Sequence, residues 1–342
     1  MKKIIIDTDT GSDDAVALLM ALREPSVQVV AFTTVSGNIE VNQATYNCLQ
    51  TIEYADTYRP PVYKGASHPL YCAYENADQV HGKDGMGDVG TFKKPTREAE
   101  PEFAVDAMLR LLREGDGDIE IFAIGPLTNL AMAILQEPET MKKVPHITIM
   151  GGGLPYNNPH TVWAEFNVMC DPEAADIVCG FGVPFTMVTL EACWGDMRFD
   201  EADIKRFREL NEAGRFCVDC NCTAIDLARR VHGEGSFDLP DPAAFIPLVR
   251  PDLIRTSFES YTRVDLKGEH TRGATIFETP DLSFMKEMCI RDRSVMWAAP
   301  SAHFTTRSNA SSTASRESAR TKYLLPAVSG TMLGARPPST ML

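Results

Sequence analysis

Short apolar runs alternate with longer amphipathic stretches along most of this 342-residue chain. Runs rich in β-branched residues predict strands at Lys2–Asp7, Val27–Val35, Ile119–Ile124, His146–Met150 and Pro184–Leu190. Apolar residues at helical spacing predict helices at Asp13–Arg23, Val41–Asp56, Phe103–Arg113, Leu127–Leu135 and Pro172–Cys179. This alternation predicts an α/β fold: an open, mostly parallel, doubly wound (Rossmann-like) sheet with helices on both faces.

Two later stretches extend this pattern. Residues 200–231 have a helical pattern, and Ser260–Phe277 has the alternation of a β-hairpin with Gly268 in its turn.

The character of the chain changes near residue 286. From there to Leu342 eight Lys or Arg residues stand against three Asp or Glu, whereas the first 285 residues have 25 against 44. We therefore interpret residues 1–285 as a single domain and residues 286–342 as an aberrant or disordered tail. The segment Met288–Arg293 reads MCIRDR, which resembles translated sequencing-adapter DNA, so we also consider a non-native origin of the tail.

Composition and charge exclude several classes of protein. The net charge of −14 argues against a nucleic-acid partner. The apolar run after Met1-Lys2-Lys3 is too short for a signal peptide, and no stretch of 18 apolar residues predicts a membrane span. The nine cysteines show no disulfide-scaffold spacing. We therefore expect a cytoplasmic protein with reduced thiols and no membrane contact.

Four carboxylates follow the first predicted strand within eight residues: Asp7, Asp9, Asp13 and Asp14. Ser12 as an N-cap and the helix dipole would explain Asp13 and Asp14, but not the two aspartates at the strand end. Crowded carboxylates repel one another, and a bound hard cation such as Ca²⁺ or Mg²⁺ relieves the repulsion. The pattern therefore indicates a metal or catalytic site.

Other polar residues follow the carboxyl ends of the predicted strands, where ligands bind in open α/β sheets. They are Ser36-Gly37-Asn38, Gly125-Pro126-Leu127-Thr128-Asn129 and Glu191, and beyond Met150 come Asn157, Asn158, Glu165 and Asn167. Each alone is typical of a turn or cap, but their shared location indicates a site for sugar hydroxyls.

Six motifs in this order carry a resemblance to a known family. They are DTDTGSDDAVALLMAL, TTVSGN, IGPLTNLA, MGGG, AEFNVMCDPEAA and LPDP, and they span residues 1 to about 280. The set resembles the nucleoside hydrolase family of the inosine-uridine preferring type. The resemblance implies a catalytic domain over residues 1–285, tightly bound Ca²⁺, and hydrolysis of the N-glycosidic bond of ribonucleosides to ribose and free base.

The resemblance also assigns roles to individual residues. It implies that Ca²⁺ is bound by Asp9, Asp14, Asp241 and the main-chain carbonyl of Ile124, and that Asp9 is the general base for the metal-bound water. Asp7 is expected to brace the turn from behind. The expected sugar contacts are Asp13, Asn38 and Asn167 at the 2′- and 3′-hydroxyls, Glu165 with Asn157 or Asn158 at the 5′-hydroxyl, and Met150 beneath the ring.

The chain departs from the family pattern at Pro240, where well-studied members have a histidine that is thought to protonate the leaving base. His81 matches a family loop histidine and is our candidate for contact with the base. Trp163, Trp194 and His232 are further candidates for that contact. The base preference stays open at this point. A homodimer or homotetramer is the subunit arrangement that the family implies.

Two other functions fit parts of the sequence. Asp7-Thr8-Asp9-Thr10 resembles the nucleophile motif of haloacid dehalogenase-type phosphatases, with Asp7 as the nucleophile. Alternatively, the chain is a non-catalytic homologue that binds ribosyl ligands through the same metal site. Cys217, Cys220 and Cys222 lack a fourth ligand in their pattern, so they indicate a metal site only weakly.

Overall fold

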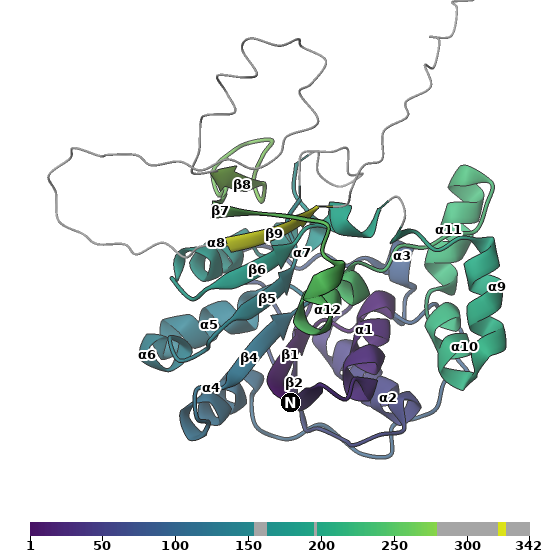
Figure 1. The fold of residues 1–342 in the computed structure, drawn as a ribbon, viewed down its shortest axis with the longest axis horizontal. Coiled ribbons are helices and arrows are strands. Elements are labelled where there is room, and N and C mark those ends of the chain that lie inside the picture. Colours follow the sequence, from purple (N-terminus) through teal and green to yellow (C-terminus); the bar gives the residue numbers. More distant parts are fainter. Residues whose placement is uncertain (154–162, 195–196, 279–320, 326–342) are drawn as a thin grey trace, which may run out of the picture.

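The computed structural model describes residues 1–153, 163–194, 197–278 and 321–325 of the chain. Its strands form one sheet in the order β3-β2-β1-β4-β5-β6-β9-β7-β8 (Figure 1). The bounds are β1 Lys2–Thr8, β2 Val27–Thr34, β3 Val62–Lys64, β4 Ile119–Ala123, β5 Ile147–Met150, β6 Phe185–Val188, β7 Thr256–Val264, β8 Thr275–Glu278 and β9 Thr321–Leu325.

The helices that surround the sheet come mostly between consecutive strands. They are α1 Ser12–Arg23, α2 Val41–Ala55, α3 Asp78–His81, α4 Ala104–Glu114, α5 Thr128–Gln136, α6 Pro138–Met141, α7 Phe166–Cys170, α8 Pro172–Gly180, α9 Glu201–Leu210, α10 Glu212–Asp219, α11 Cys222–His232 and α12 Pro240–Val249. Short 3₁₀ turns cover Leu190–Cys193 and Pro251–Leu253.

The first six strands in the sheet order, β3-β2-β1-β4-β5-β6, all pair in parallel. The direction in which the chain adds strands to the sheet reverses between β1 and β4. Strands β2 and β3 lie on one side of β1, while β4, β5 and β6 follow on the other. Open α/β sheets bind ligands at such a reversal, outside the carboxyl ends of the strands, which here are those of β1 and β4.

Strand β1 shows why the sheet needs helices on both faces. Ile4, Ile5 and Ile6 are all fully buried; Ile4 and Ile6 belong to one core cluster and Ile5 to the other. Because successive side chains of a strand point to opposite faces, an unbroken apolar run must be covered twice. Figure 1 shows α4, α5 and α8 on one face and α1, α2 and α12 on the other, with α9, α10 and α11 grouped beyond α1.

The predicted α/β class is confirmed, with a doubly wound parallel centre and helices on both faces. The strand predicted at Pro184–Leu190 is shorter, because it ends at Val188 and a 3₁₀ turn begins at Leu190. The helical stretch 200–231 is three helices, which Asn211 and the turn at Cys220-Asn221 separate. The predicted hairpin is confirmed as β7 and β8, which pair antiparallel.

Strand β9 lies between β6, to which it is parallel, and β7, to which it is antiparallel. Its five residues belong to the stretch that the sequence predicts to be an aberrant or disordered tail. The boundary at residue 285 stays a prediction.

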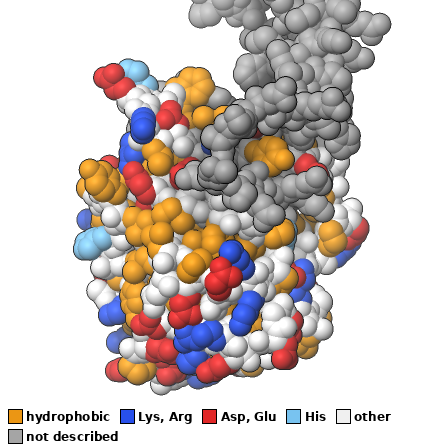
Figure 2. All heavy atoms as spheres, turned by 90° about the vertical axis from the view of Figure 1, so that its left-hand side faces the viewer, with side chains coloured by type: hydrophobic (Ala, Val, Ile, Leu, Met, Phe, Trp, Pro, Cys, Tyr) orange, Lys and Arg blue, Asp and Glu red, His pale blue; other side chains and the backbone are white. Residues whose placement is uncertain are grey.

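No helix among the described residues combines the length and apolar character that crossing a membrane requires. Figure 2 shows the side of the molecule that lies at the left in Figure 1, where hydrophobic side chains lie among basic and acidic ones. The negative net charge is therefore not gathered into one acidic patch on this face.

Candidate functional site

Five aspartates are buried around the reversal point of the sheet. Asp7, Asp9 and Asp14 have no exposed surface, and Asp13 and Asp241 are exposed by only 7% and 2%. The first four come from the end of β1 and the first turn of α1, whereas Asp241 comes from the first turn of α12. Helices α1 and α12 pack against each other, which brings residue 241 to the acidic turn.

Three of these side chains converge as metal ligands do. One carboxylate oxygen each from Asp13, Asp14 and Asp241 lies within 4.8 Å of the other two. A group of buried carboxylates with oxygen atoms this close suits a hard divalent cation. Two of the three, Asp14 and Asp241, were predicted as metal ligands. The third, Asp13, was predicted as a sugar contact.

Asp9 lies beside this group in a narrow space between two glycines. A Cβ at Gly37 would lie 2.1 Å from Asp9 Oδ2, and a Cβ at Gly125 would lie 2.7 Å from Asp9 Oδ1. The Asn38 backbone N–H donates to Oδ2 at 2.5 Å, while Oδ1 is buried and has no hydrogen-bond partner among the described residues. Glycine is therefore required on both sides, and one oxygen of Asp9 remains available to a ligand.

Asp14 is fixed on both of its oxygens. Thr8 Oγ1 donates to Oδ1 at 2.6 Å, and Oδ2 accepts from the Gly11 N–H at 2.9 Å and from Asn38 Nδ2 at 3.0 Å. Gly11, not Ser12, is the N-cap of α1, so the predicted N-cap role of Ser12 is wrong. Position 12 already has helical geometry, which leaves its hydroxyl free to bind elsewhere.

Burial and mutual repulsion raise the pKa values of these carboxyl groups. Burial raises the pKa of Asp13 to about 6 and, with a contribution from the charge of Asp13, that of Asp14 also to about 6. The pKa values of Asp9 and Asp241 are raised well above their usual value, first by burial and then by the charges of neighbouring aspartates. A bound cation would reverse these shifts, because it stabilises the ionised form.

Asp7 braces the end of β1 from behind. Its Oδ1 accepts from Thr33 Oγ1 at 2.5 Å and from Asn129 Nδ2 at 2.8 Å, which ties β1 to β2 and α5. Burial raises its pKa to about 7. These two hydrogen bonds agree with the bracing role expected of Asp7, and they do not test the phosphatase alternative.

His81 is held at the same turn as a neutral ring. The Ser12 backbone N–H donates to His81 Nδ1 at 3.3 Å, and the Ser12 hydroxyl lies 2.8 Å from that atom. Since Nδ1 accepts, the ring proton is on Nε2. Burial lowers the pKa of His81 to about 4, so its 3.6 Å approach to Asp13 Oδ1 is not an ion pair at neutral pH. No pattern in the sequence indicates that Ser12 orients this ring.

Helix α7 supplies the opposite wall of the site. Glu165 caps it by accepting from the N–H groups of Asn167 and Val168, and its Oε2 also accepts from the Gly152 N–H at 3.0 Å. Asn167 Nδ2 donates to the carbonyls of Ile124 at 3.1 Å and Met150 at 3.3 Å. The ends of β4 and β5 and the start of α7 therefore meet, as the strand-end pattern predicted.

The buried carboxyl group of Glu165 predicts a pH dependence of stability. Burial raises its pKa from the usual 4.5 to about 7, so the folded state binds its proton more tightly than the unfolded state. The raised pKa of Glu165 therefore adds to the free energy of unfolding at pH 4.5. This contribution, up to about 3 kcal/mol, is lost as the pH rises to about 7. In cation-free protein, urea unfolding at pH 5 and 8 should show a larger loss for the wild type than for Glu165→Gln.

The control for this prediction is Glu139→Gln, because Glu139 has a side chain exposed by 82%. This variant should keep the wild-type pH dependence. Equal pH dependence in the wild type and Glu165→Gln would contradict the raised pKa.

The other predicted contacts are not brought together in the same way. Asn157 and Asn158 lie outside the described residues. Trp163 is 40% exposed, Trp194 follows the 3₁₀ turn after β6, and His232 is exposed at the end of α11. The contacts of these three residues with a base stay predictions.

Pro240 is the first residue of α12, with Leu239 as N-cap, so Asp241 lies in the first turn and is not itself the cap.

Two cysteines between α10 and the start of α11 make hydrogen bonds to backbone carbonyls. Cys220 Sγ donates to the Ser12 carbonyl at 3.4 Å and Cys222 Sγ to the Gly87 carbonyl at 2.9 Å. Among the described residues these thiols do not form a metal-ligating cluster.

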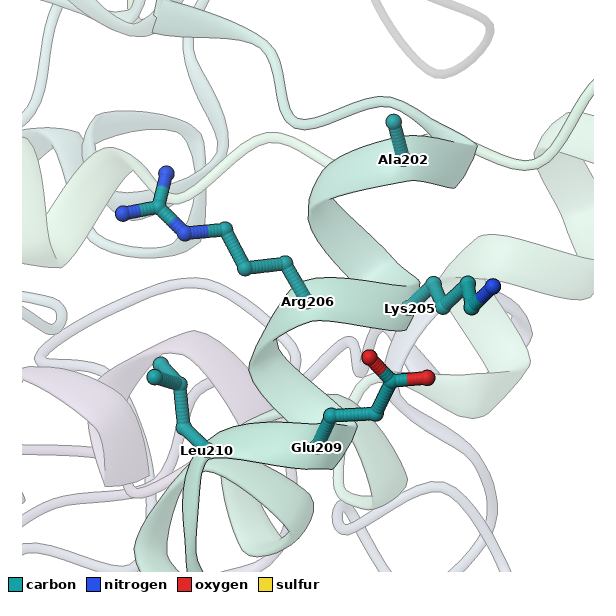
Figure 3. Close-up of a pocket in the computed structure, with 5 residues that line it drawn as sticks. All are labelled: Ala202, Lys205, Arg206, Glu209 and Leu210. Carbon is teal, nitrogen blue, oxygen red and sulfur yellow. The ribbon is translucent and has the colours of Figure 1, made fainter.

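A surface hollow on α9 is separate from this site. It is lined by Ala202, Lys205, Arg206, Glu209 and Leu210, and Figure 3 shows that all five side chains come from this one helix. It contains no residue of the acidic cluster, and we assign it no function.

Known proteins resemble this chain in sequence and in fold. Residues 4–310 match the sequence profile of the inosine-uridine preferring nucleoside hydrolases. The chain is 33% identical over 280 residues to the pyrimidine-specific ribonucleoside hydrolase RihA of Enterobacter sp. (strain 638), covering 80% of this chain and 87% of that protein. It is 35% identical over 269 residues to uridine nucleosidase 1 of Arabidopsis thaliana, covering 78% and 79%.

Solved structures show the same likeness. The plant nucleoside hydrolase PpNRh1 superposes with a TM-score of 0.77 at 30% identity, covering 95% of this chain and 94% of that one. The purine-preferring ribonucleoside hydrolase from Gardnerella vaginalis superposes with a TM-score of 0.75 at 32% identity, covering 81% and 88%.

Proposed function

Because this chain belongs to the inosine-uridine preferring nucleoside hydrolase family, we propose that it hydrolyses ribonucleosides with Ca²⁺ held in its aspartate cluster and Asp9 as the general base. The products are ribose and the free base. The observation that carries the proposal is the convergence of the buried Asp13, Asp14 and Asp241 beside Asp9, whose Oδ1 lacks a partner among the described residues.

The residues present fit a hard cation. Asp9, Asp14, Asp241 and the main-chain carbonyl of Ile124 would hold it, since Ca²⁺ takes oxygen ligands from carboxylates and carbonyls. The Ile124 carbonyl accepts one hydrogen bond from Asn167 and has a second lone pair available. When bound, such a cation supplies Lewis acidity that lowers the pKa of a water molecule and orients the ribose.

Asp9 is the residue best placed to accept the proton of the attacking water. Asn38 and the glycines on either side fix its carboxylate, so the position of Oδ1 is set before the substrate arrives. General bases act best when they are positioned in this way within hydrogen-bond reach of the proton.

The sugar would lie between the end of β2 and the start of α7. Asp13, Asn38 and Asn167 offer carboxylate and amide groups to its hydroxyls, and Glu165 offers a carboxylate on the far wall. Loss of the base develops positive charge on the ribose, as in other glycosidases that pass through an oxocarbenium-like transition state. Nearby carboxylates stabilise that charge.

Pro240 cannot protonate a leaving base, so another group must stabilise it. His81 is the candidate, because its neutral ring carries the proton on Nε2, which can donate to a nitrogen or oxygen of the base. The homodimer or homotetramer, the cytoplasmic location and the identity of the metal as Ca²⁺ stay predictions.

The test is release of free ribose from inosine, uridine, cytidine and adenosine, with and without a chelator. Both pyrimidine-specific and purine-preferring enzymes are among the relatives, so both base classes are needed. We expect release that falls at least about 100-fold on chelation and returns with Ca²⁺. Bound Ca²⁺ and bound nucleoside without ribose release would favour the non-catalytic ribosyl-binding alternative instead.

A further inference from the structure

The segment between β3 and α3, residues 65–77, is called here the rim segment. Its two ends are tied to the residues that follow β2. The Ser36 N–H donates to the Ala66 carbonyl at 3.0 Å, and the Ala77 N–H donates to the Asn38 carbonyl at 3.0 Å. In its middle, the Leu70 N–H donates to the buried Asp171 at 2.8 Å. The ends of the rim segment are therefore fixed beside the residues that follow β2, and its middle is fixed to the N-cap residue of α8.

Tyr74 in this segment has an unusual environment. The residue as a whole is half-buried, yet its hydroxyl is buried and has no hydrogen-bond partner among the described residues. The ring therefore lies at the rim with its polar end turned inward. A buried hydroxyl without a hydrogen-bond partner lowers the stability of the folded protein. Native proteins rarely keep one unless a ligand or water forms the missing hydrogen bond.

The rim segment brings Tyr74 near one of the proposed sugar contacts. Tyr74 is three residues from Ala77, whose partner Asn38 donates its own N–H to Asp9. Burial raises the pKa of the Tyr74 phenol, and the negative charge of Asp9 is the next largest cause, ahead of Cys170 in α7. The Tyr74 phenol is therefore within electrostatic range of Asp9, and the segment that carries it is hydrogen-bonded to Asn38, one of the proposed sugar contacts.

We propose that the Tyr74 hydroxyl donates a hydrogen bond to a hydroxyl oxygen of the bound ribose and so acts as a further substrate-positioning residue. The inference rests on the proposed function. The donor is a neutral phenol O–H, and a ribose hydroxyl is an acceptor of matching chemistry. A nucleobase nitrogen or oxygen also accepts hydrogen bonds, so the experiment uses analogues that differ only in their ribose hydroxyls.

The experiment compares Tyr74→Phe, which keeps the ring, with Tyr71→Phe, a control in the same segment whose residue is 82% exposed. We measure kcat/KM for ribose release from inosine and inhibition constants of the 2′-, 3′- and 5′-deoxy analogues of inosine. Tyr74→Phe should lower kcat/KM about tenfold, and Tyr71→Phe should leave it unchanged. For the one analogue that lacks the hydroxyl bound by Tyr74, the wild type and Tyr74→Phe should bind equally well.

A second readout separates positioning from a merely structural role. Removing an unpartnered buried hydroxyl should keep or raise the Tm of the ligand-free protein while it weakens binding. A kcat/KM within twofold of the wild type, or an equal loss on all three analogues, would overturn the proposal while leaving the hydrolase function intact. If the wild type releases no ribose, calorimetric binding of inosine and the three analogues to both proteins decides the same question.

Discussion

Asparagine in place of Asp9 is expected to lower kcat/KM for ribose release about 10³-fold, which corresponds to about 4 kcal/mol of transition-state stabilisation. Asparagine keeps the size of the side chain and can still accept the Asn38 N–H, but its amide cannot take a proton from water. The effect should appear in kcat, because the sugar contacts on Asn38 and Asn167 remain. Steady-state kinetics with Ca²⁺ in excess provides the measurement.

The same variant has a built-in test of folding. Removing one of several crowded buried carboxylates should raise the Tm of the cation-free protein, because the remaining aspartates lose a repelling neighbour. Asp118→Asn is the matched control, since Asp118 is half-exposed, pairs with Lys3 and directly precedes β4, at the opposite end of the strands from the acidic cluster. Turnover of Asp9→Asn within tenfold of the wild type would remove Asp9 as the general base.

Asparagine in place of Asp241 is expected to weaken Ca²⁺ binding at least about 100-fold, because the site loses one of its converging charged ligands. Ribose release should then be lost at micromolar Ca²⁺ and recover partly at millimolar Ca²⁺, which a defect in folding would not do. Calorimetric titration of chelator-treated protein with Ca²⁺ measures the affinity directly.

Asp238→Asn is the control for this prediction. Asp238 lies three residues earlier in the same connection, but it pairs with Arg198 near the surface. Its replacement should leave the Ca²⁺ affinity unchanged. If Asp241→Asn also binds Ca²⁺ with wild-type stoichiometry and affinity, Asp241 is not a ligand and the cluster needs another explanation.

Local patterns were sufficient for the parallel centre of the fold. The run Ile4-Ile5-Ile6 is apolar at every position, and only a strand covered on both faces buries such a run. The turn that follows β1 likewise had to gather Asp7, Asp9, Asp13 and Asp14, because they are close in the chain. The amphipathic stretch 200–231 was recognised as helical, but its division into three helices depends on local caps such as Asn211, which hydropathy does not detect.

Long-range partners were beyond what the residues alone could indicate. The residues around Asp241 indicate only an ordinary helix start, and the family resemblance alone selected it as a metal ligand. Asp241 converges with Asp13 and Asp14 because α12 packs against α1. The contact of Ser12 with His81 is similar, since 69 residues separate them and α3 is too short to be predicted from periodicity.

The sequence by itself determined the doubly wound α/β class, the acidic turn after β1 and the resemblance to a hydrolase family, because each depends on spacing within a few residues. The tertiary structure alone decided that Asp13 joins the converging carboxylates, that Ser12 holds the His81 ring, and that the Tyr74 hydroxyl is buried without a partner among the described residues. The physical reason is that these contacts join segments far apart in the chain. Their geometry is set by how helices pack on the sheet, which no local pattern encodes.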